Sequence, residues 1–222
     1  MSLLANRFPP TTFSIGFLEC PLEVACDADR QWRTNMGQWS FRDVSGDLDL
    51  LLRRLEPLSG PQTQHIWIAT YSEWTAYFDN FINGTDASGC ISTMSERIGC
   101  RGLLVSCHPN IPGTSYGQSR FDLYGQEPTN TFNCTRSVAA TNDSGQWSWD
   151  TSGEPLNFES TEAYKNRRIV DRLTPAIVGE YAHALGVDAF NDSFYGNLGC
   201  LVTNENINRS RLRRVRQTVM LV

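Results

Sequence analysis

The stretch from Arg136 to Phe190 constrains the fold more than any other part of this chain. Its first half, SVAATNDSGQWSWDTSGEPLNFE, alternates apolar and polar residues around a turn rich in Asn, Asp and Gly, which is typical of a β-hairpin. Its second half, AYKNRRIVDRLTPAIVGEYAHALGVDAF, carries apolar residues three and four positions apart, which is typical of amphipathic helices. A chain with both patterns is expected to bury helices against a sheet, as α+β structure.

Two helices are predicted in the second half of this stretch. The first is expected to begin at Ser160 or Thr161, and its apolar residues are Tyr164, Ile169, Val170 and Leu173. The second is expected to begin at Thr174-Pro175, because Thr is a good N-cap and proline suits the first helical position. Gly186 is expected to end it, because glycine accepts the left-handed conformation that follows a helix.

The remaining segments alternate between strand-like and helix-like patterns. Strands are predicted at 11–18, 39–44, 65–70, 74–81, 101–107, 119–124, 136–141, 146–150 and 199–203, with a short one at 156–158. Helices are predicted at 48–55 behind Ser45 or Asp47, at 86–98 behind Asp86 and at 208–219, whereas 26–36 is interpreted as loop or a short helix. We expect a mainly antiparallel sheet of six to eight strands with helices packed mostly on one face.

The sequence shows no repeat and no linker, so a single α+β domain over 1–222 is the simplest organisation. Within it, 1–60 would supply N-terminal strands and a helix, 61–206 the core sheet and helices, and 207–222 a basic C-terminal helix. No apolar run is long enough to cross a membrane, and the start MSLLANRFPP does not resemble a secretory signal. We therefore expect a cytoplasmic protein without a membrane partner.

The charges of the chain are unevenly distributed. The whole chain has 19 basic and 24 acidic residues, a net charge of −5. Its last sixteen residues carry five arginines and no acid, which leaves 14 basic against 24 acidic residues and a net charge of −10 for the body. These arginines are Arg209, Arg211, Arg213, Arg214 and Arg216. An acidic body favours a basic protein partner and disfavours nucleic acid. Nucleic-acid binding through the C-terminal arginines remains an alternative.

No catalytic or cofactor motif occurs in the sequence. The seven cysteines are irregularly spaced without a CxxC pair, so we expect free thiols and no metal site. Glycine-rich phosphate loops, GxSxG and HExxH are absent, so no cofactor and no catalytic residue is predicted. An enzyme with an unrecognised site at strand ends remains a second hypothesis. Such a site would be formed by Asp79, Asp143 or His108, if these side chains converge in a pocket.

Several segments together resemble a known group of proteins. They are WTAYFDN (74–80), GTDA (84–87), the hairpin at 137–159 and the helical stretch at 163–190. In pattern they resemble a family of bacterial cytosolic proteins similar to the immunity proteins of polymorphic or contact-dependent toxin systems. The similarity covers roughly residues 62–195. It implies a non-enzymatic protein that neutralises a cognate toxin by binding it directly, and the acidic body suits a basic toxin.

The residues predicted to contact this partner lie on the hairpin and on the following charged segment. Alternation along a strand places Trp147 and Trp149 on one side of the hairpin, and tryptophan is frequent at the centre of protein interfaces. The predicted contact residues are Trp147, Trp149, Asp143, Arg167, Arg168 and Asp171. The identity of the partner, the oligomeric state and the strand order do not follow from the sequence.

Overall fold

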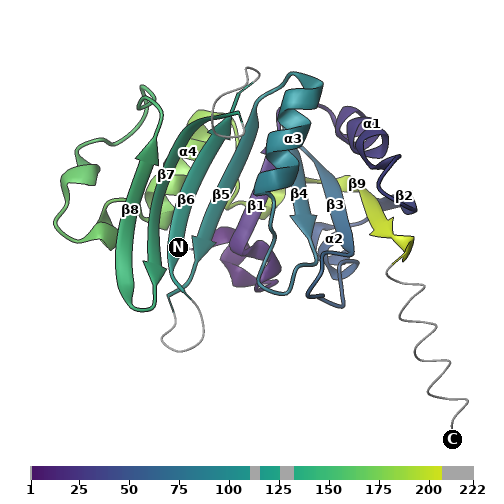
Figure 1. Ribbon diagram of the computed structural model, residues 1–222, viewed down its shortest axis with the longest axis horizontal. Coiled ribbons are helices and arrows are strands. Elements are labelled where there is room, and N and C mark those ends of the chain that lie inside the picture. The colour runs from purple at the N-terminus through teal and green to yellow at the C-terminus, as the bar shows by residue number, and fades with distance from the viewer. Residues whose placement is uncertain (1, 111–115, 126–132, 207–222) are drawn as a thin grey trace, which may run out of the picture.

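The computed structural model describes residues 2–110, 116–125 and 133–206, which fold as one antiparallel sheet flanked by helices (Figure 1). Its strands are β1 (Ser14–Leu18), β2 (Trp39–Ser45), β3 (Gln64–Thr70), β4 (Thr75–Asp79), β5 (Gly102–His108), β6 (Gln118–Tyr124), β7 (Cys134–Asp143), β8 (Gln146–Ser152) and β9 (Tyr195–Asn204). They lie in the order β2-β9-β3-β4-β1-β5-β6-β7-β8. The predicted α+β class and antiparallel sheet are confirmed. The nine described strands exceed the predicted number because the N-terminal and C-terminal strands join the same sheet.

Helices cover both faces of this sheet. The helices α1 (Leu22–Arg33) and α3 (Ser88–Ile98) lie in front of it in Figure 1, whereas α2 (Leu48–Arg53) and α4 (Pro175–Ala184) lie behind it. The prediction that helices pack mostly on one face was therefore wrong in this detail. The physical reason is that central strands such as β1 and β4 are buried along their whole length, and such strands require cover on both sides.

Each face of the sheet has its own hydrophobic core. Behind the sheet, α2 and α4 pack on a large cluster that includes Phe17, Phe78 and Phe121. In front, α1 and α3 pack on a smaller cluster that includes Trp67 and Tyr77. Helix α3 approaches β1 so closely that a Cβ on Gly16 would lie 2.6 Å from Cγ1 of Ile91. Glycine at position 16 therefore allows this contact between helix and strand.

Most of the expected helix ends and turns occur where local chemistry placed them. Thr174 Oγ1 accepts a hydrogen bond from the Ile177 amide at 3.3 Å, and Gly186 follows α4 with a φ of +83°. Asp47, and not Ser45, caps α2 through the Leu50 amide at 2.8 Å. The turn between β7 and β8 has positive φ at Ser144 and Gly145, as expected for a tight hairpin.

The predicted helix from Ser160 to Leu173 is absent. In its place the chain forms two short 3₁₀ turns, η3 (Ala163–Lys165) and η4 (Ile169–Asp171), separated by the extended Asn166 with φ −55° and ψ 140°. Tertiary hydrogen bonds override the helical periodicity here, because the Tyr164 hydroxyl bonds both the Glu159 carboxylate at 2.7 Å and the Tyr181 hydroxyl at 2.9 Å.

Three further local predictions need correction. Leu156–Phe158 is not a strand, because the Leu156 amide bonds the Glu159 side chain at 3.0 Å and not a neighbouring strand. Asp86 does not cap α3, whose N-cap is Ala87 without a side-chain bond. In the segment interpreted as loop or a short helix at 26–36, the helical alternative holds as far as Arg33, but the helix is the twelve-residue α1, which begins earlier, at Leu22. The predicted helix at 208–219 lies outside the described residues.

Candidate binding face

The front of the sheet is covered by helices over only part of its width. Helix α1 contacts β2, β3 and β9, and α3 contacts β1, β5 and β6. No described helix lies in front of β7 and β8 in Figure 1. The back of the same strands is covered, because η4 contacts both β7 and β8 and α4 contacts β6. We call the front of β7 and β8, with the adjoining front of β6 that α3 covers only in part, the open face.

The strand register brings polar side chains side by side on the open face. Three rows cross the strands, since each residue of β7 pairs with one residue on either neighbouring strand. Side chains alternate along a strand, so these rows point away from the core that contains Phe121 and Val138. The rows are Gln118, Thr141 and Ser148; Arg120, Ala139 and Asp150; and Asp122, Ser137 and Ser152.

A buried carboxylate organises the centre of this face. Asp122 is fully buried, and its oxygens accept from Arg120 Nη2 and from Ser137 Oγ, each at 2.6 Å. The Tyr124 hydroxyl donates to Asp122 at 3.4 Å, and burial first, then the negative charge of Asp122, raises the pKa of Tyr124 far above neutrality. Arg120 keeps a 37% exposed side chain, and its Nε has no hydrogen-bond partner among the described residues. The face therefore presents a guanidinium that Asp122 holds in place.

A cavity of about 410 Å³ lies where α3 meets the open face. A volume of this size is typical of sites that hold a small molecule or one anchoring side chain of a partner. The lining side chains are mostly uncharged, and burial raises the pKa of the Cys134 thiol to about 11, so this thiol is protonated at neutral pH. The described lining residues are Ser88, Gly89, Ser92, Thr93, Arg120, Tyr124, Cys134, Ser137 and Ser152.

A chain of hydrogen bonds links β1 and β5 to the edge of the open face. Ser14 Oγ lies 3.1 Å from His108 Nε2 and 2.8 Å from Ser106 Oγ, and Ser106 Oγ donates to Gln118 Oε1 at 3.1 Å. Burial lowers the pKa of His108, so its imidazole is neutral at pH 7. A serine beside a neutral histidine is half of a nucleophilic site. However, Ser14 is only 6% exposed, and no carboxylate among the described residues hydrogen-bonds His108.

The three candidates for a catalytic site at strand ends do not converge. Asp79 is fully buried, and its carboxylate accepts from the amides of Phe81 at 2.9 Å and Asp86 at 3.0 Å. Burial raises its pKa to about 6. Asp143 is exposed at the β7–β8 turn, and His108 ends β5 on the far side of β1 from β4. Asp79 therefore stabilises a turn and is not part of a shared pocket with the other two.

The two predicted contact tryptophans point to the back of the sheet. Trp147 and Trp149 are half-buried against the rear core, and the Trp149 ring centroid lies 5.0 Å from that of Tyr164. The side of the hairpin that remains accessible is therefore the opposite one, which carries Ser148 and Asp150. The open side of the hairpin could have been predicted from the tryptophans, because side chains alternate along a strand and the residues next to a buried tryptophan point to the opposite side.

The charged residues of the predicted contact set lie near the same end of the sheet. Asp143 is exposed at the turn, and Arg167 is exposed between η3 and η4. Arg168 forms an ion pair with Asp171 at 3.5 Å, and both remain accessible to solvent. Because η4 packs against β7 and β8 from behind, this segment lies on the side of the hairpin opposite the open face. A role for these residues in binding stays a prediction.

Other predicted features have simple outcomes. None of the seven cysteines, all of which lie in the described residues, forms a disulfide, and six of them are buried, as expected for small apolar side chains. The five C-terminal arginines from Arg209 to Arg216 lie outside the described residues. In the described ranges, no three His, Cys, Asp or Glu residues are grouped as a metal site would require, and none of the helices has the length and apolarity that a membrane crossing demands. Comparisons with protein-family models, curated proteins and solved structures find no match to this chain.

Proposed function

We propose that this chain is a non-enzymatic binding protein that recognises a protein partner through the open face. The observation that carries the proposal is the uncovered front of β7 and β8, together with the polar side chains of the open face and the cavity where the cover by α3 ends on β6. A sheet whose back is packed and whose front lacks a helix offers a broad, rigid surface. Partners bind such preformed surfaces with little change in the backbone.

The charges of the body support a basic partner. Without residues 207–222 the chain carries 14 basic and 24 acidic residues, as counted above. Many of these basic side chains are already engaged by acids of the same chain. Ion pairs occupy Arg7, Arg30, Arg33, Arg101, Arg120, Arg136, Lys165 and Arg168. The unpaired charge of the body is therefore mostly negative, and it would attract a positively charged partner during association.

The chemistry of the face supports binding in preference to catalysis. Asp122 is held by three donors, and the hydroxyl of Ser137 is already donated to it. The neighbouring thiol of Cys134 and the hydroxyl of Tyr124 both have pKa values raised by burial, so neither is a ready nucleophile or base at neutral pH. Such groups can accept and donate hydrogen bonds to a partner without exchanging protons.

The specific role that we propose is neutralisation of a cognate bacterial toxin by direct binding. The resemblance of residues 62–195 to immunity proteins supports it, and the acidic body suits a basic toxin such as a nuclease. In this role the open face would cover the active site of the toxin. The resemblance suggests that the partner is a toxin, and the charge of the body suggests that this toxin is basic.

Co-expression with the product of the adjacent gene tests the proposal. We expect the two proteins to co-purify and the chain to protect cells that express the neighbour. Asp150→Arg reverses a charge on the open face and should abolish capture and protection. Glu180→Arg makes the same reversal on exposed α4 behind the sheet and should leave both intact. Absence of any complex and of any protection would refute the binding role, and equal loss in both variants would refute the assignment to the open face.

A further inference from the structure

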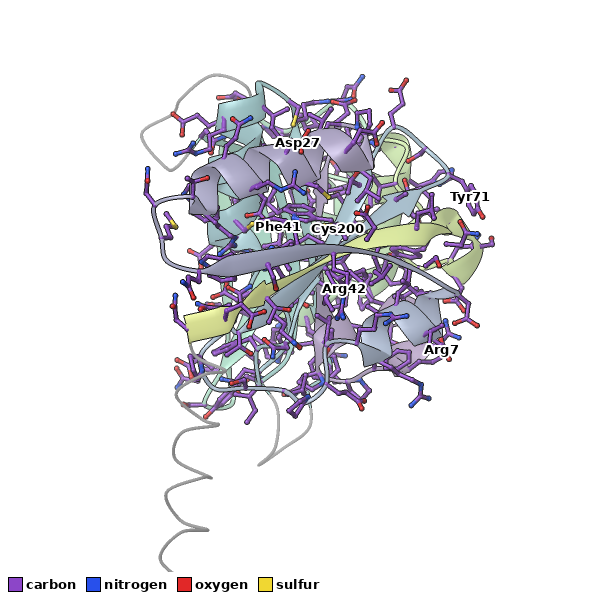
Figure 2. All side chains as sticks on the ribbon, turned by 90° about the vertical axis from the view of Figure 1, so that its right-hand side faces the viewer. Arg7, Asp27, Phe41, Arg42, Tyr71 and Cys200 are labelled. Carbon is purple, nitrogen blue, oxygen red and sulfur yellow. The ribbon has the colours of Figure 1, made fainter. Side chains whose placement is uncertain are left out.

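A second cavity lies at the opposite edge of the sheet, between the end of α1 and the edge strand β2. Its volume is about 450 Å³. Figure 2 looks onto this edge and shows Phe41 on β2 below Asp27 on α1. The described residues that line the cavity are Arg30, Arg33, Thr34, Gly37, Gln38, Trp39 and Phe41. Two of them are arginines and none is acidic, although acids outnumber bases in the body of the chain.

Arg33 is held in this cavity by a buried carboxylate. Its side chain is only 7% exposed, and its Nε donates to Asp29 Oδ1 at 2.6 Å. The other oxygen of Asp29 lies 2.5 Å from His65 Nε2 and accepts from Trp67 Nε1 at 3.0 Å. Asp29 thus accepts a hydrogen bond from the Nε of Arg33 only, and both Nη nitrogens of Arg33 lack a hydrogen-bond acceptor among the described residues.

The protonation states of this cluster follow from its surroundings. Burial lowers the pKa of His65, so its imidazole is neutral and donates through Nε2, which leaves Nδ1 as a buried acceptor without a described partner. Burial alone would raise the pKa of Asp29, but His65, Arg33 and Trp67 outweigh it and lower the value to about 2. Asp29 is therefore ionised near neutral pH and fixes the guanidinium of Arg33.

Aromatic rings pack against the two arginines of the cavity. The Arg33 guanidinium carbon lies 4.0 Å from the ring centroid of Trp39 and 4.9 Å from that of Trp32. The indole Nε1 of Trp39 is buried and has no hydrogen-bond partner among the described residues. Arg30 lies 4.9 Å from the ring centroid of Phe41. An unpartnered indole donor and two arginines therefore border one cavity.

We propose that this cavity binds a phosphate group. A phosphate monoester carries close to two negative charges and three terminal oxygens at neutral pH, which matches two guanidinium groups and one indole donor. Arg30 is also paired with Asp27 at 2.5 Å, but both side chains are more than half exposed, so solvent weakens this pair and a bound phosphate can compete for Arg30.

A simpler role for the two arginines would be to neutralise the negative C-terminal end of the α1 dipole, but this role does not explain the burial of Arg33 or the unpartnered Trp39 Nε1. Basic residues in the last turn of a helix serve that purpose from the surface, as Arg30 does. Burying Arg33 under two indole rings costs desolvation that a surface arginine avoids. The dipole also gives no reason for a buried Trp39 Nε1 without an acceptor. The oxygens of a phosphate in the cavity would supply acceptors for the Arg33 guanidinium and for the Trp39 indole N–H.

Calorimetric titration of the full-length chain with inorganic phosphate, at ionic strength held constant with sodium chloride, tests the proposal. We expect saturable binding of one phosphate per chain. Arg30→Gln removes one guanidinium and should weaken binding about tenfold, the effect of losing one charge-assisted hydrogen bond. Trp39→Phe keeps a ring beside Arg33 and removes the unpartnered N–H, so it should also weaken binding while the protein stays folded.

The matched control is Arg168→Gln, which removes an exposed arginine that, like Arg30, pairs with an aspartate three residues away. It should leave phosphate binding unchanged. Absence of saturable binding to the wild-type chain would overturn the proposal, and so would equal weakening by Arg168→Gln. Saturable binding of acetate as tight as that of phosphate would overturn the choice of ligand. The titration contains no protein partner, so its outcome is independent of the proposed function.

Discussion

The two ends of the front of the sheet differ in how far their arginine–aspartate pairs are exposed to solvent. Under α1, Asp29 is fully buried and its partner Arg33 is only 7% exposed. On the open face, Asp122 is equally buried, but its partner Arg120 has a 37% exposed side chain. The same pairing of an arginine and an aspartate is thus enclosed by a helix at one end and left accessible at the other. The two pairs have the same residue types, so packing of the helix against the sheet decides which pair a protein partner can contact.

The same difference separates polar groups that hold the fold together from polar groups that can bind a protein partner. The Asp29 cluster joins α1 to β3 through His65 and Trp67, so its loss would release a helix from the sheet. The Asp122 cluster joins neighbouring strands that backbone hydrogen bonds already hold together. We therefore expect substitutions under α1 to affect stability strongly, and substitutions on the open face to affect mainly binding.

Removal of the two buried aspartates should show the largest contrast. Asp29→Ala leaves Arg33 buried without its counterion and should destabilise the fold by about 3–5 kcal/mol. Asp122→Ala leaves Arg120 able to turn to water and should cost about 1–2 kcal/mol. Urea denaturation followed by fluorescence measures both. Equal losses of stability would show that cover by α1 does not distinguish the two pairs.

The pH dependence of stability should isolate a third buried carboxyl, Asp79. Its pKa in the folded chain is raised by burial to about 6 from 3.8, so the folded state prefers its protonated form. The corresponding stability is complete below pH 4 and is lost as the pH rises through 6, a loss of about 3 kcal/mol. His65 has a lowered pKa and gives the opposite slope, because it loses stability as the pH falls below 6.5.

Comparison of Asp79→Asn with the wild-type chain separates these two contributions. Between pH 4 and pH 7 the stability of the variant relative to wild type should increase by up to about 3 kcal/mol, because only the wild-type chain loses the contribution of Asp79. Denaturation at a series of pH values measures it, with the exposed Asp150→Asn as the control. A constant difference between variant and wild type across this range would contradict the raised pKa of Asp79.

The covered and open parts should also differ in their tolerance of added side-chain volume. Gly16→Ala would place a Cβ within 2.6 Å of Ile91 and 2.8 Å of Ala87 on or beside α3, so we expect a cost of about 1–3 kcal/mol. Ser148→Val adds volume at an exposed position of the open face and should change stability by less than about 0.5 kcal/mol. Thermal denaturation of the two variants compares these sites, and a large cost at Ser148 would show that the face is not open.

The smallest effect on stability is expected for Asp150→Arg. The side chain is exposed, so the charge reversal should change the free energy of unfolding by less than about 0.5 kcal/mol. Thermal denaturation beside the wild-type chain checks this. A marked destabilisation would mean that a loss of partner binding in this variant reports on folding and not on the open face.

Local features of the fold could be predicted from the sequence. The β7–β8 hairpin, the Thr174-Pro175 start of α4 and the end of α4 at Gly186 each depend on a few neighbouring residues, and each occurs as expected. The position of β9 between β2 and β3 could not be predicted, because it depends on contacts between residues at least 125 positions apart. The cover on both faces was missed for the same reason.

The candidate site was only partly visible in the sequence. Trp147 and Trp149 marked the correct hairpin, but burial of their rings behind the sheet makes the opposite side the accessible one. Arg120 and Asp122 carried no motif, since an arginine and an aspartate two positions apart on a strand are common. The Asp29–His65 contact joins a helix to a strand 36 positions away, and no local pattern indicates such a pair.

The central claim is that a protein partner covers the open face. Its most direct test is the rate of maleimide labelling at a cysteine introduced on either side of the sheet, with and without the co-purified neighbour. Ser148→Cys places the thiol on the open face, and Ala176→Cys places it on exposed α4 behind the sheet. We expect the partner to slow labelling at position 148 at least about tenfold, by excluding solvent as interface cores do, and to leave position 176 unchanged. Protection at position 176 with free labelling at position 148 would contradict the account.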